Sequence, residues 1–266
     1  MSRRLFRLPL CLALLAWLPV QAQEKDEPIS PDRPDFIESS ETVGRGRVEF
    51  ETSFLSERER GEGEREHTLS MPTLLRIGIG DAVELRIESE GRTVRHTREL
   101  ESGERSTLAG YDDTAIGLLW HVADGEGKRP SVGVLVDAQL PTGSKALRGK
   151  GVRPSLRVVG EWELPGDMEL GVMPGVALER REETGRYTYG LLGVVLEKQF
   201  GARLRGIAEL AMPQIASSRH GGTEASLGVG AVYLLTNDCA IDTMFSRGLN
   251  SRTPYASWTV GLSFRL

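Results

Sequence analysis

The side chains of this sequence that could do chemistry are mostly charged groups set inside alternating segments. In the run VELRIES from 83 to 89, acids and an arginine occupy every second position, with apolar residues between them. Charges placed in this way can bind ions or polar solutes, or they can neutralise one another in a confined space. Eleven positions follow the pattern: Glu49, Glu51, Glu84, Arg86, Glu88, Asp137, Arg157, Glu161, Arg205, Glu209 and Asp242.

Catalytic residues are harder to identify. The chain has no G-x-S-x-G, H-E-x-x-H or C-x-x-C motif. No serine spacing singles out a partner for the scattered histidines, which are His67, His96, His121 and His220. The basic stretch LPTGSKALRGKG (140–151) lacks a following helix and is interpreted as an exposed loop. Asp112-Asp113 could bind a cation, but such a pair more often ends a loop. We therefore predict no enzyme, no cofactor and no metal site.

The charged positions lie on elements with a period of two. In VEFETSF (48–54), SVGVLVDAQL (131–140) and YASWTVGLSFRL (255–266), apolar residues alternate with polar or small ones. This pattern indicates β-strands with two different faces. We expect about twelve strands, at 47–57, 68–79, 82–94, 107–122, 130–141, 152–164, 168–180, 187–200, 203–216, 224–236, 239–248 and 255–266.

Short and long connections alternate between these strands. Tight turns rich in Gly, Asp, Asn and Pro are expected at 80–81, 124–128, 165–167, 201–202 and 237–238. Longer polar connections are expected at 57–67, 94–107, 142–151, 180–186, 217–223 and 248–254. Short turns on one side and longer loops on the other are typical of outer-membrane barrels.

Two architectures fit these strands, a soluble sandwich or barrel and a transmembrane barrel. In the transmembrane barrel the apolar faces meet lipid, and closure pairs every backbone group. The last strand favours the membrane, because Trp258, Val260, Leu262, Phe264 and Leu266 share one face, although a terminal aromatic residue is usual. We predict an all-β fold, a closed antiparallel transmembrane β-barrel over residues 47–266. Its eleven charges either fill a narrow lumen as an ionic network or line a selective conduit.

The first 22 residues have the pattern of a secretory signal peptide. A basic start precedes an apolar stretch that is too short to span a bilayer, and we expect cleavage after Ala22. Removal would change the formal charge from −5 to −8 and leave Cys239 as the one cysteine. An acidic chain is a poor candidate for binding nucleic acid, and one cysteine cannot form an internal disulfide.

The next segment, 23–46, is too polar for lipid and too rich in proline for a regular strand. Its candidate plug residues are Asp32, Arg33, Pro34 and Asp35. The segment is either a periplasmic tail or a plug inserted into the lumen. In the lumen, the predicted partners of its acids are Arg86, Arg157 and Arg205, and those of Arg33 are Glu49, Glu84 and Glu161.

Four stretches resemble a family of outer-membrane transporter-like proteins associated with the meta-pathway of phenol degradation. They are PDRPDFIESSETVGRGRVEFE (31–51), DDTAIGLLW (112–120), LPTGS (140–144) and VGLSFRL (260–266), and Asp242 also fits. The resemblance implies a signal-bearing barrel in the outer membrane of a Gram-negative bacterium. It also implies transport of small, often aromatic or apolar, compounds.

Together these observations predict a passive channel for small molecules. Its expected partners are outer-membrane lipid, small-molecule cargo and the barrel-assembly machinery, without nucleic acid. Two alternatives stay open, which are a barrel lipid hydrolase and a structural or adhesion barrel with a filled lumen.

Overall fold

The structure is a computed structural model that describes residues 28–61, 63–181 and 185–266. The predicted signal peptide and its cleavage after Ala22 lie outside these residues. Within them, no helix is long and apolar enough to cross a membrane, and η1 (Ser218–His220) is a single 3-10 turn. The strands are β1 (Val48–Arg60), β2 (Glu64–Ser70), β3 (Thr73–Gly78), β4 (Val83–Ser89), β5 (Arg92–Glu99), β6 (Arg105–Tyr111), β7 (Thr114–Ala123), β8 (Ser131–Leu140), β9 (Arg153–Leu164), β10 (Met168–Arg181), β11 (Gly185–Phe200), β12 (Leu204–Ile215), β13 (Ser226–Thr236), β14 (Cys239–Gly248) and β15 (Ala256–Arg265).

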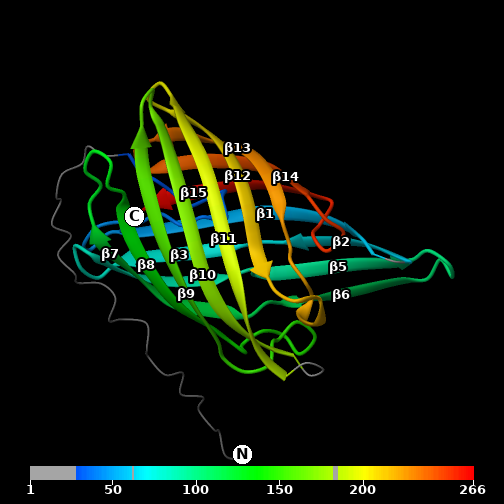
Figure 1. Cartoon of the computed structure of the whole chain (residues 1–266). Helices are drawn as coiled ribbons and strands as arrows, with labels where there is room; N and C mark the ends of the chain where they lie inside the picture. The colour runs from blue at the N-terminus through cyan, green and yellow to red at the C-terminus, as the bar shows by residue number, and fades with distance from the viewer. Residues whose placement is uncertain (1–27, 62, 182–184) are drawn as a thin grey trace, which may run out of the picture.

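These strands form one closed antiparallel barrel (Figure 1). β15 pairs back onto β1, from Glu49 opposite Arg265 to Arg58 opposite Ala256. Three of the twelve wall strands are each divided into two segments, namely β2 with β3, β4 with β5, and β6 with β7. The predicted all-β fold, a closed antiparallel barrel of about twelve strands, is confirmed.

The three divided walls break side by side. Pro72, between β2 and β3, lacks the N–H that a ladder needs, and Gly91, between β4 and β5, has a φ of +64° that favours glycine. Backbone hydrogen bonds connect the breaks, from Met71 N to the Glu90 oxygen (3.2 Å) and from Asp112 N to the Gly91 oxygen (2.9 Å). The sheet can therefore bend along this line.

Beyond the bend, β2, β5, β6 and the end of β1 form a flap that projects past the other strands (Figure 1). We call this the outer flap. Residues 57–67 and 94–107 were predicted as long polar loops, which is wrong for most of both segments. They belong mainly to these strands, and the connections shrink to 61–63 and 100–104. Cross-strand pairing stabilises the polar sequence in an extended form, so polarity alone misjudged it.

The outward face of the barrel carries an apolar belt. Leu118, Val136 and Val229 are 46%, 53% and 62% exposed, and each alternates with an inward residue. The inward face is mixed, because a buried apolar cluster on one side includes Leu119, Leu135, Val159, Met173 and Val195. The wall of the lumen is therefore partly polar and partly apolar.

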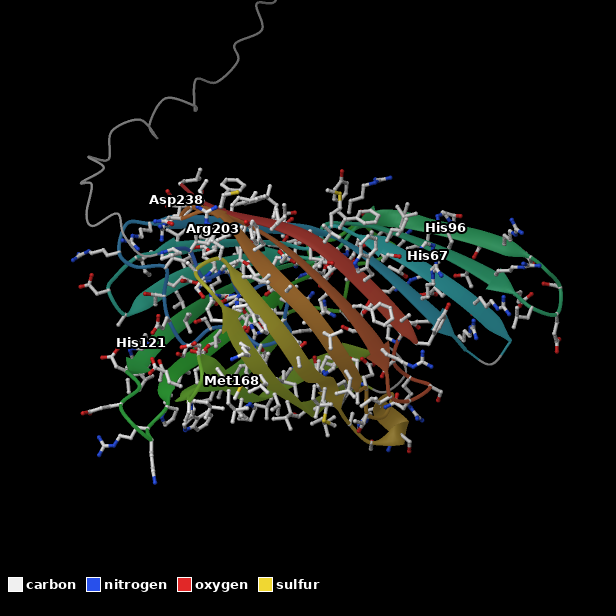
Figure 2. All side chains as sticks on the ribbon, turned by 90° about the horizontal axis from the view of Figure 1, so that it is seen from above. His67, His96, His121, Met168, Arg203 and Asp238 are labelled. Carbon is white, nitrogen blue, oxygen red and sulfur yellow. The ribbon has the colours of Figure 1, made fainter. Side chains whose placement is uncertain are left out.

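The short turns and the C-terminus lie at one end of the barrel, and the outer flap lies at the other. Figure 2 shows His121, Arg203 and Asp238 near the turn end, and His67 and His96 on the flap. Short turns are periplasmic in outer-membrane barrels, so the flap end is the extracellular end.

Candidate functional site

Residues 28–46, which we call the lumen segment, run through the inside of the barrel. Their backbone N–H groups donate to wall groups on opposite sides. Ile29 N donates to the Asn237 oxygen (2.8 Å), Phe36 N to the Glu209 carboxylate (2.7 Å) and Val43 N to the Glu84 carboxylate (2.8 Å). The segment is therefore held by several walls at once.

Glycines in the wall leave room for this segment. A Cβ at Gly133 would lie 2.8 Å from the Cα of Ser40, and one at Gly193 would overlap the side chain of Ile37. Ser40 and Ile37 are both buried. The absence of a side chain at Gly133 and Gly193 is thus explained by close contact with the lumen segment.

Arg76, on β3, lies at the centre of the ionic contacts. Its guanidinium is 2.8 Å from Glu84, 3.1 Å from Asp32 and 3.4 Å from Glu51, and the residue is only 2% exposed. Sequence reasoning missed this residue. The signal was its inward position, since it alternates with the outward Leu75 and Ile77.

Two further arginines join the lumen segment to the wall. Arg86 lies 2.7 Å from Asp32 and 2.9 Å from Glu84, and it also contacts Glu38. Arg157 lies 3.0 Å from Glu38 and 2.8 Å from Asp137. The acids of the segment therefore neutralise the wall arginines.

The predicted partners of Arg33 are wrong. Its guanidinium donates to the Thr259 hydroxyl (2.8 Å) and lies 3.8 Å from Asp242, on β15 and β14. The reason is its direction: Arg33 N donates to Glu51 at 3.1 Å, so the side chain extends toward the neighbouring strands. Pro34 follows through a cis peptide bond.

The structure places all eleven charged candidates on the inner wall. Buried ones are Glu49, Glu51, Glu84, Arg86, Glu209 and Asp242, and half-buried ones are Glu88, Asp137, Arg157, Glu161 and Arg205. They form no single site. Glu161 accepts from Ser40 N (2.9 Å), and Arg205 donates to the Pro31 oxygen (3.0 Å), so these two residues bind other points of the lumen segment than Arg76 does through Asp32.

Two aspartates of the lumen segment have opposite electrostatic environments. Burial alone would raise the pKa of Asp32, but Arg76 and Arg86 outweigh it and hold that pKa below its ordinary range. For Asp35, burial raises the pKa well above its ordinary value, and the nearby acids Glu197 and Glu209 add to the rise, while Arg205 opposes it. Asp32 thus favours docking as a carboxylate, whereas Asp35 favours it as the neutral acid.

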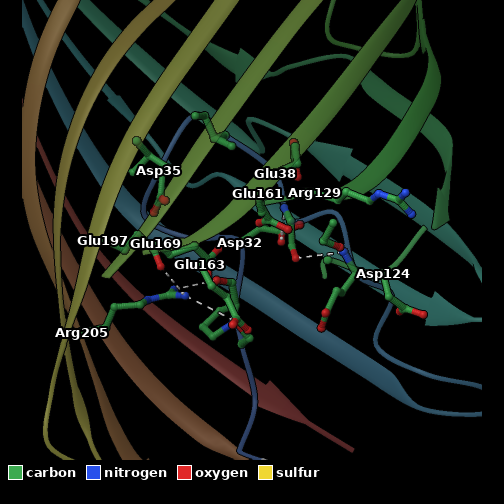
Figure 3. A pocket seen from close by; sticks show the side chains of 18 of the residues that line it. Asp32, Asp35, Glu38, Asp124, Arg129, Glu161, Glu163, Glu169, Glu197 and Arg205 are labelled. Carbon is green, nitrogen blue, oxygen red and sulfur yellow. Dashed lines mark hydrogen bonds and ion pairs between the residues drawn. The ribbon is translucent and has the colours of Figure 1, made fainter. Parts of the chain in front are cut away.

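The lumen segment lies between two cavities. The periplasmic cavity, about 270 Å³, is lined by Asp35 and Ile37 and by wall acids that include Glu161, Glu169 and Glu197 (Figure 3). The extracellular cavity, about 320 Å³, is lined by Phe36 and by wall residues of the outer half, among them Glu179 and Tyr189. The short stretch 36–37 therefore contributes to both cavities.

Two serine–histidine contacts occur among the described residues, one between strands β1 and β2 and a longer one of 3.3 Å between Ser217 and His220 at the η1 turn. Ser56 Oγ lies 2.9 Å from His67 Nε2, on the outward face of β1 and β2. A hydrolytic triad needs a third group that orients the imidazole. Among the described residues, no side chain makes a hydrogen bond to Nδ1 of His67. The contact alone does not assemble a hydrolase site.

Comparison with known proteins gives a family and a fold. A family model described as "Putative MetA-pathway of phenol degradation" matches residues 31–266. None of the curated proteins matches this sequence significantly.

Several solved structures are similar. The COG4313 outer-membrane channel from Pseudomonas putida F1 superposes with a TM-score of 0.62 at 10% identity, covering 86% of this chain and 98% of that one. The β-domain of the Bordetella autotransporter BrkA gives 0.57 at 14% identity, covering 83% and 100%. The NanC porin gives 0.52 at 11% identity, covering 82% and 100%. These similarities confirm the predicted fold, an antiparallel barrel of the kind found in outer-membrane proteins.

Proposed function

Since this chain belongs to the family of the MetA pathway of phenol degradation, we propose that it is a passive outer-membrane channel gated by its own lumen segment. The observation that carries the proposal is the pair of cavities on either side of residues 36–37. Withdrawal of this short stretch would connect the two cavities. A solute would then cross by diffusion, without covalent chemistry.

The cargo we propose is a small molecule with an apolar ring and a polar group. One side of the lumen wall offers the buried apolar residues Met173 and Val195, and the other offers the charges around Arg76. Such a wall suits an aromatic compound with a hydroxyl or carboxyl group. The family's association with phenol degradation supports this class of cargo.

The contacts of the lumen segment suit a gate. They are mainly hydrogen bonds and ion pairs, and water can replace each of them when the segment leaves. Ile29 and Ile37 would lose burial, and so would inward-facing wall side chains of the same apolar cluster, such as Met173 and Val195. The closed state is therefore stabilised by many individually modest contacts.

Single-channel recording in planar bilayers tests this function. Deletion of residues 24–42 should raise conductance while the barrel still assembles, because the strands stay whole. Arg45→Gln is the matched control, since Arg45 is an exposed residue of the same segment. Unchanged conductance in the deletion variant would instead support a structural or adhesion barrel whose lumen is filled.

The lipid-hydrolase alternative rests on the Ser56–His67 contact. A serine-directed fluorophosphonate probe would label Ser56 in such an enzyme, and Ser56→Ala would abolish the labelling. We expect no labelling, because no third side chain orients His67 among the described residues.

We also propose that the barrel-assembly machinery inserts this protein. The closing strand β15 presents Val260 and Leu262 outward and pairs with β1. Depletion of that machinery should reduce the folded, heat-modifiable form of the protein in membranes.

A further inference from the structure

Four arginines form a line across the outer flap. The strand register places Arg60 opposite Arg65, Arg65 opposite Arg98, and Arg98 opposite Arg105. We call these four residues the arginine row. Side chains directly opposite one another share a face, with Cβ atoms about 4.5–5.5 Å apart, and like charges in such pairs destabilise the sheet.

No carboxylate of the described chain forms an ion pair with the arginine row. All four residues are exposed, and Arg60 packs over the ring of Tyr255 with its guanidinium carbon 4.4 Å from the ring centre. The acids Glu59 and Glu66 are opposite each other on the other face, where Glu66 pairs with Arg95 at 2.9 Å. The positive charge of the row is therefore left for a partner outside the chain.

The row continues the lipid-facing side of the barrel. On β1, Phe54 and Ser56 point outward, opposite Val260 and Trp258, and Arg58 and Arg60 follow with the same parity. The row lies about 13 Å beyond Ser56 along the strand, at about 3.3 Å per residue. It therefore lies where an outer-leaflet headgroup would meet the flap.

A second line of residues lies between the row and the apolar belt. Register aligns Arg58, His67, His96 and Thr107 across the four strands. Figure 2 shows His67 and His96 together on the flap. A concavity of about 610 Å³ is lined by both lines and by Tyr255, and the strand positions between the two lines add Glu59 and Glu66 to its lining. On the face that carries the two lines, the side chains at the hollow are guanidinium groups, imidazoles and the Thr107 hydroxyl, because Glu59 and Glu66 belong to the opposite parity.

We propose that this face of the outer flap binds the phosphate groups of a phosphorylated lipid in the outer leaflet. Guanidinium groups bind phosphate oxygens through paired, charge-assisted hydrogen bonds. One lipid with two phosphates would relieve the repulsion between neighbouring arginines, while its acyl chains lie against the apolar belt below. This binding is separate from transport, because the row faces away from the lumen.

Lipid retention by the purified full chain tests the proposal. Native mass spectrometry from detergent would compare lipid A, which carries two phosphates, with dephosphorylated lipid A of the same acyl composition. We expect lipid A to bind about tenfold more tightly or better, since hydrogen bonds to charged groups are among the stronger ones. The triple variant Arg65→Gln, Arg98→Gln, Arg105→Gln should lose that preference.

The matched control removes three positive charges elsewhere at the extracellular end. Lys145→Gln, Arg148→Gln and Arg219→Gln are all in exposed loop or turn positions, and this triple variant should keep the lipid A preference. Heat-modifiable gel migration would establish that both variants fold. A triple Arg→Lys variant of residues 65, 98 and 105 should keep part of the preference, because it retains charge without the planar fork.

Three results would overturn the proposal. Equal binding of the two lipids would show that phosphate is not recognised. Equal loss in both Gln variants would show that net charge alone attracts the lipid. Displacement of lipid A by millimolar inorganic phosphate would show a site for free anions rather than for a lipid.

Discussion

Arginines on the inner and outer faces of this barrel differ in burial and in ion pairing. Inside, Arg76 lies within 3.4 Å of three carboxylates and is almost completely buried. On the outer flap, Arg65 and Arg98 are both exposed and lie opposite each other, and no described carboxylate pairs with either. The same side chain is neutralised by the chain itself in one place and left for the environment in the other.

The difference follows from how much water reaches the guanidinium groups on each face. A guanidinium in a narrow lumen loses water and has to be paired, because an unpaired buried charge is costly. A guanidinium on the flap keeps its water and costs little until a partner arrives. The inner arginines should therefore control folding, whereas the flap arginines should control what the folded barrel binds.

Removal of Arg76 should have the largest effect. Arg76→Ala leaves Glu51 and Glu84 buried without their shared cation, which should cost about 3–5 kcal/mol of stability. Urea unfolding of the refolded barrel, followed by tryptophan fluorescence, measures the loss. Arg65→Ala is the matched change on the flap and should stay within about 0.5 kcal/mol. Similar losses in both variants would contradict the distinction between the two faces.

A charge placed on the wrong face of one strand should have the next largest effect. Leu118→Arg puts a cation into the lipid belt and should cost about 2–4 kcal/mol if it lies near the membrane midplane. Ala115→Arg, on the same strand β7, points into the extracellular cavity, where Glu88 is the cross-strand neighbour. The fraction of heat-modifiable barrel in membranes compares the two. Better assembly of Leu118→Arg would mean that the inward and outward faces are reversed.

Alternation predicted the strands and which residues share a face, as in SVGVLVDAQL, and so the inward parity of Glu84 and Arg157. The number of walls came from the turn and loop signals, and closure came from the need to pair every backbone group in lipid. The outer flap was missed because 57–67 and 94–107 are as polar as loops. Their extended form depends on cross-strand pairing, which polarity does not reveal.

Partners inside the lumen were predicted only in part, because Arg86 and Arg157 do pair with acids of the lumen segment, whereas the predicted partners of Arg33 were wrong. The alternation along each strand predicts that Arg76 and Asp242 point inward, but it does not predict which residue of the lumen segment contacts them. That choice depends on the path of residues 28–46, which is fixed by contacts such as Ile37 against Gly193 and Ser40 against Gly133. The pairs between the lumen segment and the wall depend on how far apart the residues lie in the folded barrel, and the spacing of residues along the sequence does not specify those distances.

The smallest of these effects concerns pH and separates two aspartates of the lumen segment. Asp35 has a pKa that burial and the acids Glu197 and Glu209 raise in the docked segment, with Arg205 opposing. In water its pKa is about 3.9. Below about pH 3.9, Asp35 carries its proton whether the segment is docked or free, so it does not oppose docking. As the pH rises from about 3.9 toward the raised pKa of the docked residue, docking weakens, because only the docked state still holds the proton. Channel conductance should rise over this window.

Asp35→Asn removes that contribution, so the variant should conduct less than the wild type at neutral pH and depend less on pH. Asp32→Asn should do the reverse. The pKa of Asp32 is lowered because Arg76 and Arg86 outweigh its burial, so its carboxylate favours docking above its ordinary pKa and loses that effect only in stronger acid. Its amide would give up both ion pairs and raise conductance at neutral pH. Opposite changes from two aspartates three residues apart would show that individual contacts hold the gate. Changes of the same sign would show instead that the total negative charge of the segment sets how far it enters the lumen.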